Sequence, residues 1–173
     1  MTDLPRHPPA PGDGWVRCGC GARHWGLHGA AGLLVARRAP DGRPTHVLLQ
    51  HRAPWSHHGG TWGIPGGARQ PHEDATAAAL REAHEEAGVP ADAVRPFASH
   101  VLRHPDWSYT TVLADEVRPF EARATDAESL AVAWVPIEQV AALDLLPAFA
   151  DAWPTLLAAI PATPESAPCG PDA

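Results

Sequence analysis

The chain is predicted to fold as one α/β domain, an α/β/α sandwich over a mixed β-sheet. Three observations lead to this fold class. Apolar runs of strand length lie before and after a helix-forming segment at residues 75–87. A second helical segment follows the last strand, near the C-terminus. The length of 173 residues and the hydrophobic content of 45% are enough for one buried core.

Proline-rich segments mark both ends of the sequence. Residues 1–14 are expected to form a flexible N-terminal arm, and residues 161–173 a disordered tail. The domain itself is predicted at residues 15–160. The N-terminus lacks the basic and then apolar segments of a secretory signal, and no apolar run reaches the roughly 18 residues of a membrane span. A cytoplasmic location is therefore expected.

The first strands are expected to pair as a hairpin. Residues 30–37 form an apolar run between Gly29 and Pro40, and residues 46–51 form another. The intervening sequence Asp-Gly-Arg-Pro at residues 41–44 is typical of a turn. These two runs therefore predict a pair of antiparallel strands.

The next predicted element is the helix at residues 75–87. Its sequence is rich in alanine and other good helix formers. Asp74 is a suitable N-cap, and Gly88 stands where a left-handed C-terminal cap is usual. Both ends of this helix are therefore predicted from the sequence.

Three more strands are predicted beyond this helix, at residues 97–102, 108–114 and 131–135. The first two flank the turn sequence His-Pro-Asp at residues 104–106. From Pro136 the apolar spacing becomes helical, and a final helix is expected at residues 145–160. Pro147 fits its first turn, and Pro154 is expected to kink it.

Three glutamates of the first helix are spaced for metal binding. Glu82, Glu85 and Glu86 fall at i, i+3 and i+4, on one face of the last turns. Carboxylates at the negative end of a helix dipole cost about 0.3–1 kcal/mol each, and Glu82 and Glu86 also repel each other. A hard divalent cation, Mg²⁺ or Mn²⁺, would reverse this cost. The alternative is a solvated acidic face, which the crowding of acids at this end of the helix argues against.

This helix lies within a longer pattern, Gly67-x5-Glu73-x7-Arg81-Glu82-x-x-Glu85-Glu86-x-Gly88-Val89, which resembles the signature of the Nudix hydrolases. Every fixed position of that signature is filled. Ala83 is smaller than the family's usual aliphatic residue, and Gln70 and His72 replace the glutamate and glycine common upstream. A glycine-rich segment at residues 59–67 is also similar to the family's. The resemblance covers roughly residues 28–160 and implies the α/β/α fold.

The resemblance implies a hydrolase that uses Mg²⁺ or Mn²⁺ to cleave a diphosphate. It assigns as metal ligands Glu82, Glu85, Glu86 and the Gly66 carbonyl. It implies that Arg81 orients one of the glutamates, and that Glu73 either pairs with Arg81 or contributes an outer metal contact. Gly67 opens the motif and is expected to support the site.

The general base is left open between two positions. In this family it is sometimes a glutamate of the helix and sometimes a carboxylate on a later loop. Glu128 is the best downstream candidate, because it precedes residues 134–136, which resemble the junction after the family's catalytic loop. Glu82 is an equal candidate. Competing carboxylates nearby are Asp115, Glu116, Glu121 and Asp126.

The substrate is implied only as a class. The leading interpretation is a nucleoside triphosphate, an oxidised one included, or a related nucleoside-diphosphate derivative. The alternative is ADP-ribose, a nucleotide sugar or a dinucleotide, since Pro105, sixteen residues beyond Val89, resembles a marker of ADP-ribose substrates. A third reading is a sensor that binds a nucleotide without cleaving it, and the intact glutamates argue against that. Arg52 is a candidate phosphate ligand, and Trp62 a candidate to stack on a base.

The charge of the chain excludes other partners. Its 13 arginines, with no lysine, face 20 acidic residues, for a net charge of −7. A general nucleic-acid surface is therefore not expected, and a P-loop is excluded because it needs its lysine. The expected partner is a small nucleoside diphosphate derivative, with no membrane involved, and the chain is expected to be a monomer or a homodimer.

A separate tract holds soft metal ligands. Cys18, Cys20, His24 and His28 occur at short intervals and are candidates for zinc binding. The one-residue gap between the cysteines departs from the usual spacing of two to four, so two ordinary thiols are the alternative. Cys169 makes the cysteine count odd, and no disulfide framework is indicated.

Overall fold

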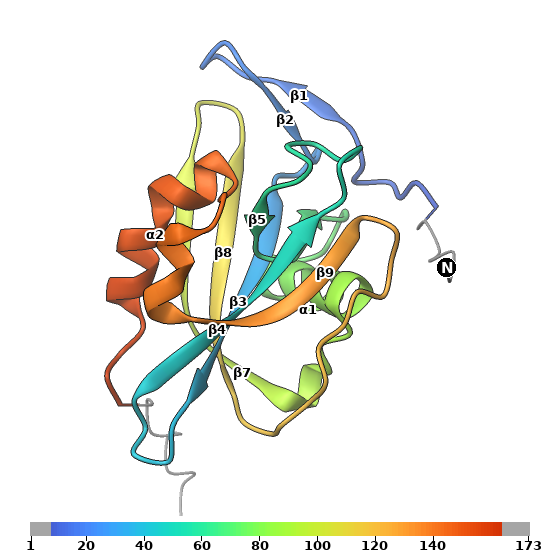
Figure 1. Ribbon diagram of the computed structural model, residues 1–173. Helices are drawn as coiled ribbons and strands as arrows, with labels where there is room; N and C mark the ends of the chain where they lie inside the picture. The colour runs from blue at the N-terminus through green and yellow to red at the C-terminus, as the bar shows by residue number, and fades with distance from the viewer. Residues whose placement is uncertain (1–7, 164–173) are drawn as a thin grey trace, which may run out of the picture.

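The computed structural model describes residues 8–163, and its seven-stranded mixed sheet lies between two helices (Figure 1). The helices α1 (Ala75–Ala87) and α2 (Pro147–Ala159) cover opposite faces of the sheet. The predicted α/β/α sandwich is therefore confirmed.

The sheet combines the predicted hairpin and a second antiparallel pair around a parallel centre. Its strands are β3 (Ala30–Arg38), β4 (Pro44–Arg52), β5 (Trp62–Gly63), β6 (Gly66–Ala68), β7 (Val94–Arg103), β8 (Ser108–Glu116) and β9 (Ser129–Pro136). Strands β3 and β4 are antiparallel, as are β7 and β8, and β3 lies parallel to β8. Strand β6 pairs with β3, whereas β5 and β9 both pair with β4. This pairing brings the segment before α1 alongside the central strand.

Strand β3 divides the core into two clusters, one on each face. Leu33 and Val35 pack on the α1 side, and Leu34 and Ala36 pack on the α2 side. This alternation follows from the period of two in a strand, and both faces are covered, so the sequence of β3 reads as one continuous apolar run. The α1 side is lined by alanines, including the fully buried Ala83, so this helix can lie close to the sheet. The small residue at position 83 therefore fits this core.

Several short elements were not predicted from the sequence. Strands β1 (Trp15–Arg17) and β2 (Arg23–Trp25) form a separate antiparallel pair. Two 3-10 helices, η1 (Ala91–Ala93) and η2 (Ile137–Ala142), precede β7 and follow β9. The helical spacing after Pro136 therefore forms a 3-10 helix first, and α2 then continues through Pro154 without interruption.

The segment at residues 8–14 is hydrogen-bonded to the domain. The Gly12 N–H donates to Gln70 Oε1 at 2.7 Å, and the Gly12 carbonyl accepts from the Leu27 N–H at 2.9 Å. The predicted domain boundaries remain a prediction, and residues 1–7 and 164–173 lie outside the described residues. In the part of the chain that the structure describes, no helix has the length and apolar character to cross a membrane.

Candidate metal centre

Helix α1 presents its glutamates next to the short strand β6. The predicted cap residues fix both ends of this helix. The Asp74 side chain accepts a hydrogen bond from the Ala77 N–H at 2.8 Å. Gly88 adopts a left-handed conformation with φ of 65°, and its N–H donates to the last carbonyls of the helix. The three candidate ligands therefore lie in the last two turns, where no intrahelical N–H can compensate their charge.

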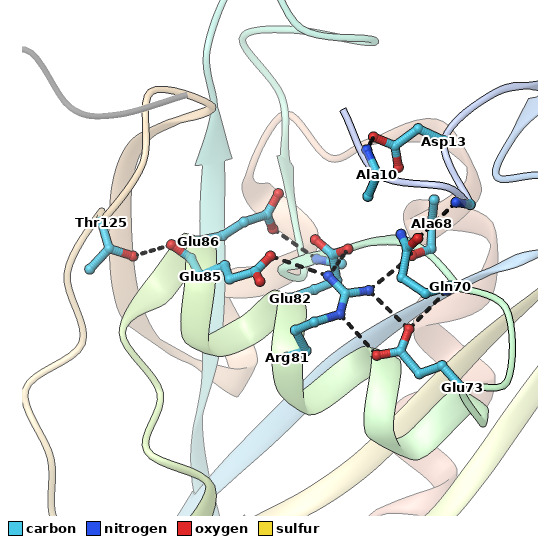
Figure 2. Close-up of polar contacts among 12 residues, drawn as sticks. Ala10, Asp13, Ala68, Gln70, Glu73, Arg81, Glu82, Glu85, Glu86 and Thr125 are labelled. Atoms are coloured by element: carbon cyan, nitrogen blue, oxygen red, sulfur yellow. Dashed lines mark hydrogen bonds and ion pairs between the residues drawn. The ribbon is translucent and has the colours of Figure 1, made fainter. Parts of the chain in front are cut away.

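Arg81 lies at the centre of the carboxylates (Figure 2). Its Nε and Nη2 donate to the two carboxylate oxygens of Glu73 at 2.9 and 3.0 Å. Its Nη1 donates to Glu82 at 2.7 Å and to Glu85 at 3.2 Å, and Nη2 also donates to the Ala68 carbonyl at 3.0 Å. The hydrogen bond from Arg81 lowers the pKa of Glu73, and Glu73 in turn raises the pKa of Arg81. Arg81 is therefore placed to orient carboxylates and not to exchange protons.

Glu86 is the most buried of the three candidate ligands, with 4% of its surface exposed. Its Oε2 accepts a hydrogen bond from the Gly66 N–H at 2.9 Å, and its backbone carbonyl accepts one from Ser129 Oγ at 3.1 Å. Burial raises the pKa of Glu86 well above its usual value, and the negative charges of Glu82 and Asp126 raise it further. The Arg52 charge and the Gly66 N–H oppose this shift only in part.

Glu82 lies against the backbone of Gly67. A Cβ atom at Gly67 would come within 2.7 Å of the Glu82 carboxylate carbon, so a glycine is required for this approach. Burial raises the pKa of Glu82 to about 7, with smaller contributions from Glu85 and Asp13, while Arg81 lowers it. Two neighbouring carboxylates thus have elevated pKa values, which is typical of sites that bind a cation or transfer a proton.

The donor set fits a hard divalent cation. It consists of carboxylate oxygens whose negative charges are only partly balanced by Arg81 and Arg52, and Mg²⁺ and Mn²⁺ prefer such ligands. Among the described residues, the oxygens of these acids do not converge as a group of three within 4.8 Å. Glu82 and Glu85 turn toward Arg81, and Glu86 turns toward Gly66 (Figure 2).

The candidate substrate residues Arg52 and Trp62 lie in different surroundings. Arg52 ends β4, donates from Nε to the His57 carbonyl at 3.1 Å and lies close enough to lower the pKa of Glu86. Trp62 stacks on His51 with ring centroids 4.7 Å apart and packs against the core cluster under α2. Arg52 thus acts on Glu86 through its charge, whereas Trp62 has protein partners on the α2 side of the sheet.

The loop before β9 contributes a buried carboxylate and an exposed one. Asp126 is 3% exposed, accepts from the Glu128 N–H at 3.1 Å and from Ser129 Oγ at 3.2 Å, and raises the pKa of Glu86. Glu128 is exposed, and its carbonyl accepts from the Ala53 N–H at 2.8 Å. The assignment of Glu128 as the base therefore stays a prediction, and Asp126 is the loop carboxylate that acts on Glu86.

Two residues near the site were not predicted from the sequence. Asp13 belongs to the N-terminal segment and adds to the negative field at Glu82, and no motif marks it (Figure 2). Tyr109 lies beneath the Gly66 backbone, where a Cβ atom would come within 2.7 Å of its hydroxyl. Burial raises the pKa of Tyr109, and the Glu86 charge adds to this. The adjacent glycines 66 and 67 were the signal that two side chains approach this strand closely.

Gln70 and His72, the two upstream departures from the family pattern, can now be placed in the structure. The Gln70 N–H donates to Glu73 Oε2 at 2.9 Å, so the residue supports the carboxylate that holds Arg81. His72 has a positive φ of 68°, a conformation that favours glycine, which is the usual family residue there.

Comparisons with known proteins show the family of the chain. The NUDIX domain family model matches residues 26–156. The chain is 48% identical over 151 residues to a Bifidobacterium longum protein named "Nucleoside triphosphate pyrophosphatase/Nudix hydrolase fusion protein", covering 86% of this chain but 31% of that protein. It is 45% identical to a Mycobacterium tuberculosis protein named "Putative 8-oxo-dGTP diphosphatase 3", covering 96% of this chain and 81% of that protein.

Solved structures give the same result. The crystal structure of a Nudix hydrolase from M. smegmatis, RenU, is 46% identical and superposes with a TM-score of 0.78, covering 89% of this chain and 100% of that one. A C. elegans Ap4A hydrolase shares the fold at a TM-score of 0.61 and 23% identity, covering 75% of this chain and 96% of that one. The complete signature, the fold and these matches together show that the chain belongs to the Nudix hydrolase family.

Proposed function

We propose that the chain is a Mg²⁺-dependent pyrophosphohydrolase that cleaves the diphosphate of nucleoside triphosphates, oxidised purine nucleotides among them. The observation that carries this proposal is the pair Glu82 and Glu86, a partly buried and a buried carboxylate with raised pKa values beside Arg81. Such a pair suits a divalent cation and the anionic substrate that the cation bridges.

Glu82, Glu85 and Glu86 would hold the cation, with the Gly66 carbonyl as a further candidate ligand. When bound, Mg²⁺ would neutralise the diphosphate oxygens and lower the pKa of an attacking water. The Gly66 N–H fixes one oxygen of Glu86, and Arg81 fixes one oxygen of Glu82. Each of these two carboxylates therefore has one oxygen held by the protein, and the proposed ligands would turn toward one another to hold the cation.

The general base would remove a proton from the attacking water. Glu82, with a pKa of about 7, is ionised in part at neutral pH and is suited to this role when it is not a ligand. Glu128 is the alternative, exposed on the loop before β9, and Asp126 is a third candidate through its interaction with Glu86. Arg52 is proposed to bind a phosphate, since it is the arginine at the end of β4 whose charge reaches Glu86.

We propose nucleoside triphosphates as substrates ahead of ADP-ribose and dinucleotides. The reason is the name of a relative that this chain covers over most of its length. The Mycobacterium tuberculosis protein is named for 8-oxo-dGTP and is covered over 81% of its length. The chain spans only 31% of the Bifidobacterium longum protein, so that protein's activities weigh less. The Ap4A hydrolase neighbour is 23% identical and supports the fold alone. A cytoplasmic location and a monomeric or homodimeric state remain predictions.

The test is a product-resolved hydrolysis panel. Nucleoside triphosphates, 8-oxo-dGTP, ADP-ribose and dinucleoside polyphosphates are incubated with the full chain in Mg²⁺ or in EDTA, and products are separated by anion-exchange chromatography. We expect a nucleoside monophosphate and pyrophosphate from the triphosphates in Mg²⁺ alone. AMP and ribose 5-phosphate from ADP-ribose, with intact triphosphates, would instead support the alternative. Tight nucleotide binding without any hydrolysis would support the sensor.

A further inference from the structure

A second cluster of metal-ligating side chains lies on the β1–β2 hairpin, outside the carboxylate site. The ligand atoms of Cys18, Cys20 and His24 all lie within 4.8 Å of one another. His24 Nε2 is 3.2 Å from Cys20 Sγ. His28 is exposed and does not belong to this group, so the tract predicted from the sequence narrows to three residues.

The turn of the hairpin explains how two cysteines with one residue between them point to one place. The Cys18 N–H donates to the Ala22 carbonyl at 3.0 Å, and the Gly21 N–H donates to the Cys18 carbonyl at 2.9 Å. Gly21 has a positive φ of 88°, so the chain reverses tightly after Cys20. The single residue between Cys18 and Cys20 argued against a metal site in the sequence. The tight turn nevertheless brings the two sulfur atoms together.

The β7–β8 turn holds the cluster from the other side. The Asp106 N–H donates to Cys18 Sγ at 3.4 Å, and Asp106 Oδ2 accepts from the Gly19 N–H at 2.7 Å. The His24 ring stacks on Trp107, with centroids 4.5 Å apart and planes at 12°, and the His104 ring is 4.3 Å from His24. Backbone donors to a cysteine sulfur and a fixed imidazole ring are what supports metal ligands in known sites.

We propose that Cys18, Cys20 and His24 bind one Zn²⁺ ion. Zinc prefers two thiolates and an imidazole nitrogen over a set of carboxylates, and Zn–S and Zn–N bonds of about 2.3 and 2.0–2.1 Å in a tetrahedron place sulfur and nitrogen about 3.6 Å apart. The observed separation of 3.2 Å between Cys20 Sγ and His24 Nε2 is close to that value. His104 or Asp106, which border the cluster, or a water would complete four ligands.

With His104 or Asp106 as the fourth ligand, the zinc ion would fasten the β1–β2 hairpin to the tip of β7 and β8. The same contact already includes a hydrogen bond of 3.1 Å from Trp107 Nε1 to the Trp25 carbonyl. The hairpin follows directly on Asp13, whose charge reaches Glu82, and on Gly12, which is bonded to Gln70. Zinc would thus act as a structural brace that holds the N-terminal segment beside the carboxylate site.

The experiment measures metal binding by the full chain, separately from hydrolysis. Reduced, metal-free protein is titrated with Co²⁺ and then Zn²⁺ in excess Mg²⁺, which occupies oxygen sites, and absorbance is recorded in the near ultraviolet and visible ranges. Metal content is measured on the zinc-loaded protein. The ligand variants are Cys20→Ser and His24→Ala, and the matched controls are Cys169→Ser and His28→Ala.

We expect one zinc ion per chain, a sulfur-to-cobalt charge-transfer band with tetrahedral visible absorption, and a higher unfolding temperature with zinc. Both ligand variants should bind zinc at least about tenfold more weakly, while both controls keep wild-type affinity. Because Cys20 is exposed, its serine variant should fold, and its far-ultraviolet circular dichroism checks this. The proposal is overturned by a wild-type titration without a thiolate band or by full zinc affinity in Cys20→Ser.

Discussion

Arg81 binds both carboxylate oxygens of Glu73, at 2.9 and 3.0 Å, eight positions earlier in the sequence. The same guanidinium donates to Glu82 at 2.7 Å. Glu73 therefore holds the Arg81 guanidinium, which in turn holds Glu82, one of the proposed metal ligands. Two parallel hydrogen bonds to one carboxylate require the planar guanidinium of arginine. A lysine at this position would keep the charge but lose this geometry.

Replacing Glu73 by glutamine should reduce turnover while the fold is kept. The amide keeps one acceptor oxygen but removes the charge that holds Arg81, so the Glu82 carboxylate loses its orientation. We expect kcat and the affinity for Mg²⁺ to fall by about 10–100-fold. Arg81→Lys should give a similar loss. Steady-state kinetics over a range of Mg²⁺ concentrations measure both quantities, and Glu138→Gln, at an exposed acid on η2, is the control. Wild-type kinetics in Glu73→Gln would contradict this role.

Glu86→Gln should separate catalysis from stability. If Glu86 is a metal ligand, its loss should lower turnover by orders of magnitude. Burial and the charges of Glu82 and Asp126 disfavour the ionised form of Glu86, so an uncharged isostere should leave the unfolding temperature in EDTA at pH 8 unchanged or higher. Differential scanning fluorimetry and a hydrolysis assay on the same preparation measure both effects. A stable variant with normal turnover would refute the ligand assignment.

Metal-free protein should lose stability as the pH rises through the pKa of Glu82. That pKa is raised from 4.5 to about 7, so between these values the folded state holds a proton that the unfolded state releases. The contribution of Glu82 to stability is therefore present below about pH 4.5 and declines toward pH 7, by at most about 1.4 kcal/mol per pH unit. Glu82→Gln should remove this decline. Urea unfolding of both proteins in EDTA, at pH 5 to 8, measures the difference, and parallel pH curves would contradict it.

Binding of Mg²⁺ should release protons near neutral pH for the same reason. The ligand form of Glu82 is the carboxylate, and at pH 6.5 part of the population is protonated in the metal-free protein. Calorimetric titrations in two buffers with different ionisation enthalpies should give different apparent heats, and at pH 8.5 this difference should be smaller. Equal heats in both buffers at pH 6.5 would show that no proton is released.

The sequence predicted the longer elements because each carries its own signals. Helix α1 has the predicted bounds, since Asp74 caps one end and Gly88 the other. The first hairpin and the strands β7 and β8 were predicted from apolar runs that flank turn residues. Strands β1, β2, β5 and β6 are two or three residues long, too short for a periodic pattern, and their pairing depends on tertiary contacts.

The sequence predicted the glutamates of the motif, but it did not predict the residues that surround them. Regular helix spacing was enough to group the three glutamates on the last turns of α1. The position of Asp13 and the burial of Asp126 follow from how distant segments fold back, which no local pattern encodes. The parallel stacking of Trp62 on His51 depends likewise on the register of β4 and β5.

Gly67→Ala should disturb the metal centre without unfolding the protein. An alanine Cβ would lie 2.7 Å from the Glu82 carboxylate, and that flexible side chain can move away at small cost. We expect turnover and Mg²⁺ affinity to fall, with little change in unfolding temperature. Gly63→Ala is the matched control, because its Cβ would meet only Leu146 at 3.7 Å, an ordinary contact. Normal turnover in Gly67→Ala would show that Glu82 has room to keep its position.

Asp115, one of the candidate bases, should affect stability and not turnover. Its Oδ1 accepts from Arg38 Nε at 2.7 Å, and the two side chains are only 4% and 9% exposed. Removing one member of a buried ion pair leaves the other charge without its partner, so Asp115→Ala should lower the free energy of unfolding by about 3–5 kcal/mol. The double variant Arg38→Met with Asp115→Leu should recover most of that loss, because a well-packed apolar pair avoids the cost of burying charge. Urea unfolding gives the free energy of unfolding of the wild type, Asp115→Ala and the double variant. Turnover per folded molecule is measured well below the unfolding temperature and should stay at the wild-type level. A specific loss of turnover in stable Asp115 variants would instead place this carboxylate in the reaction.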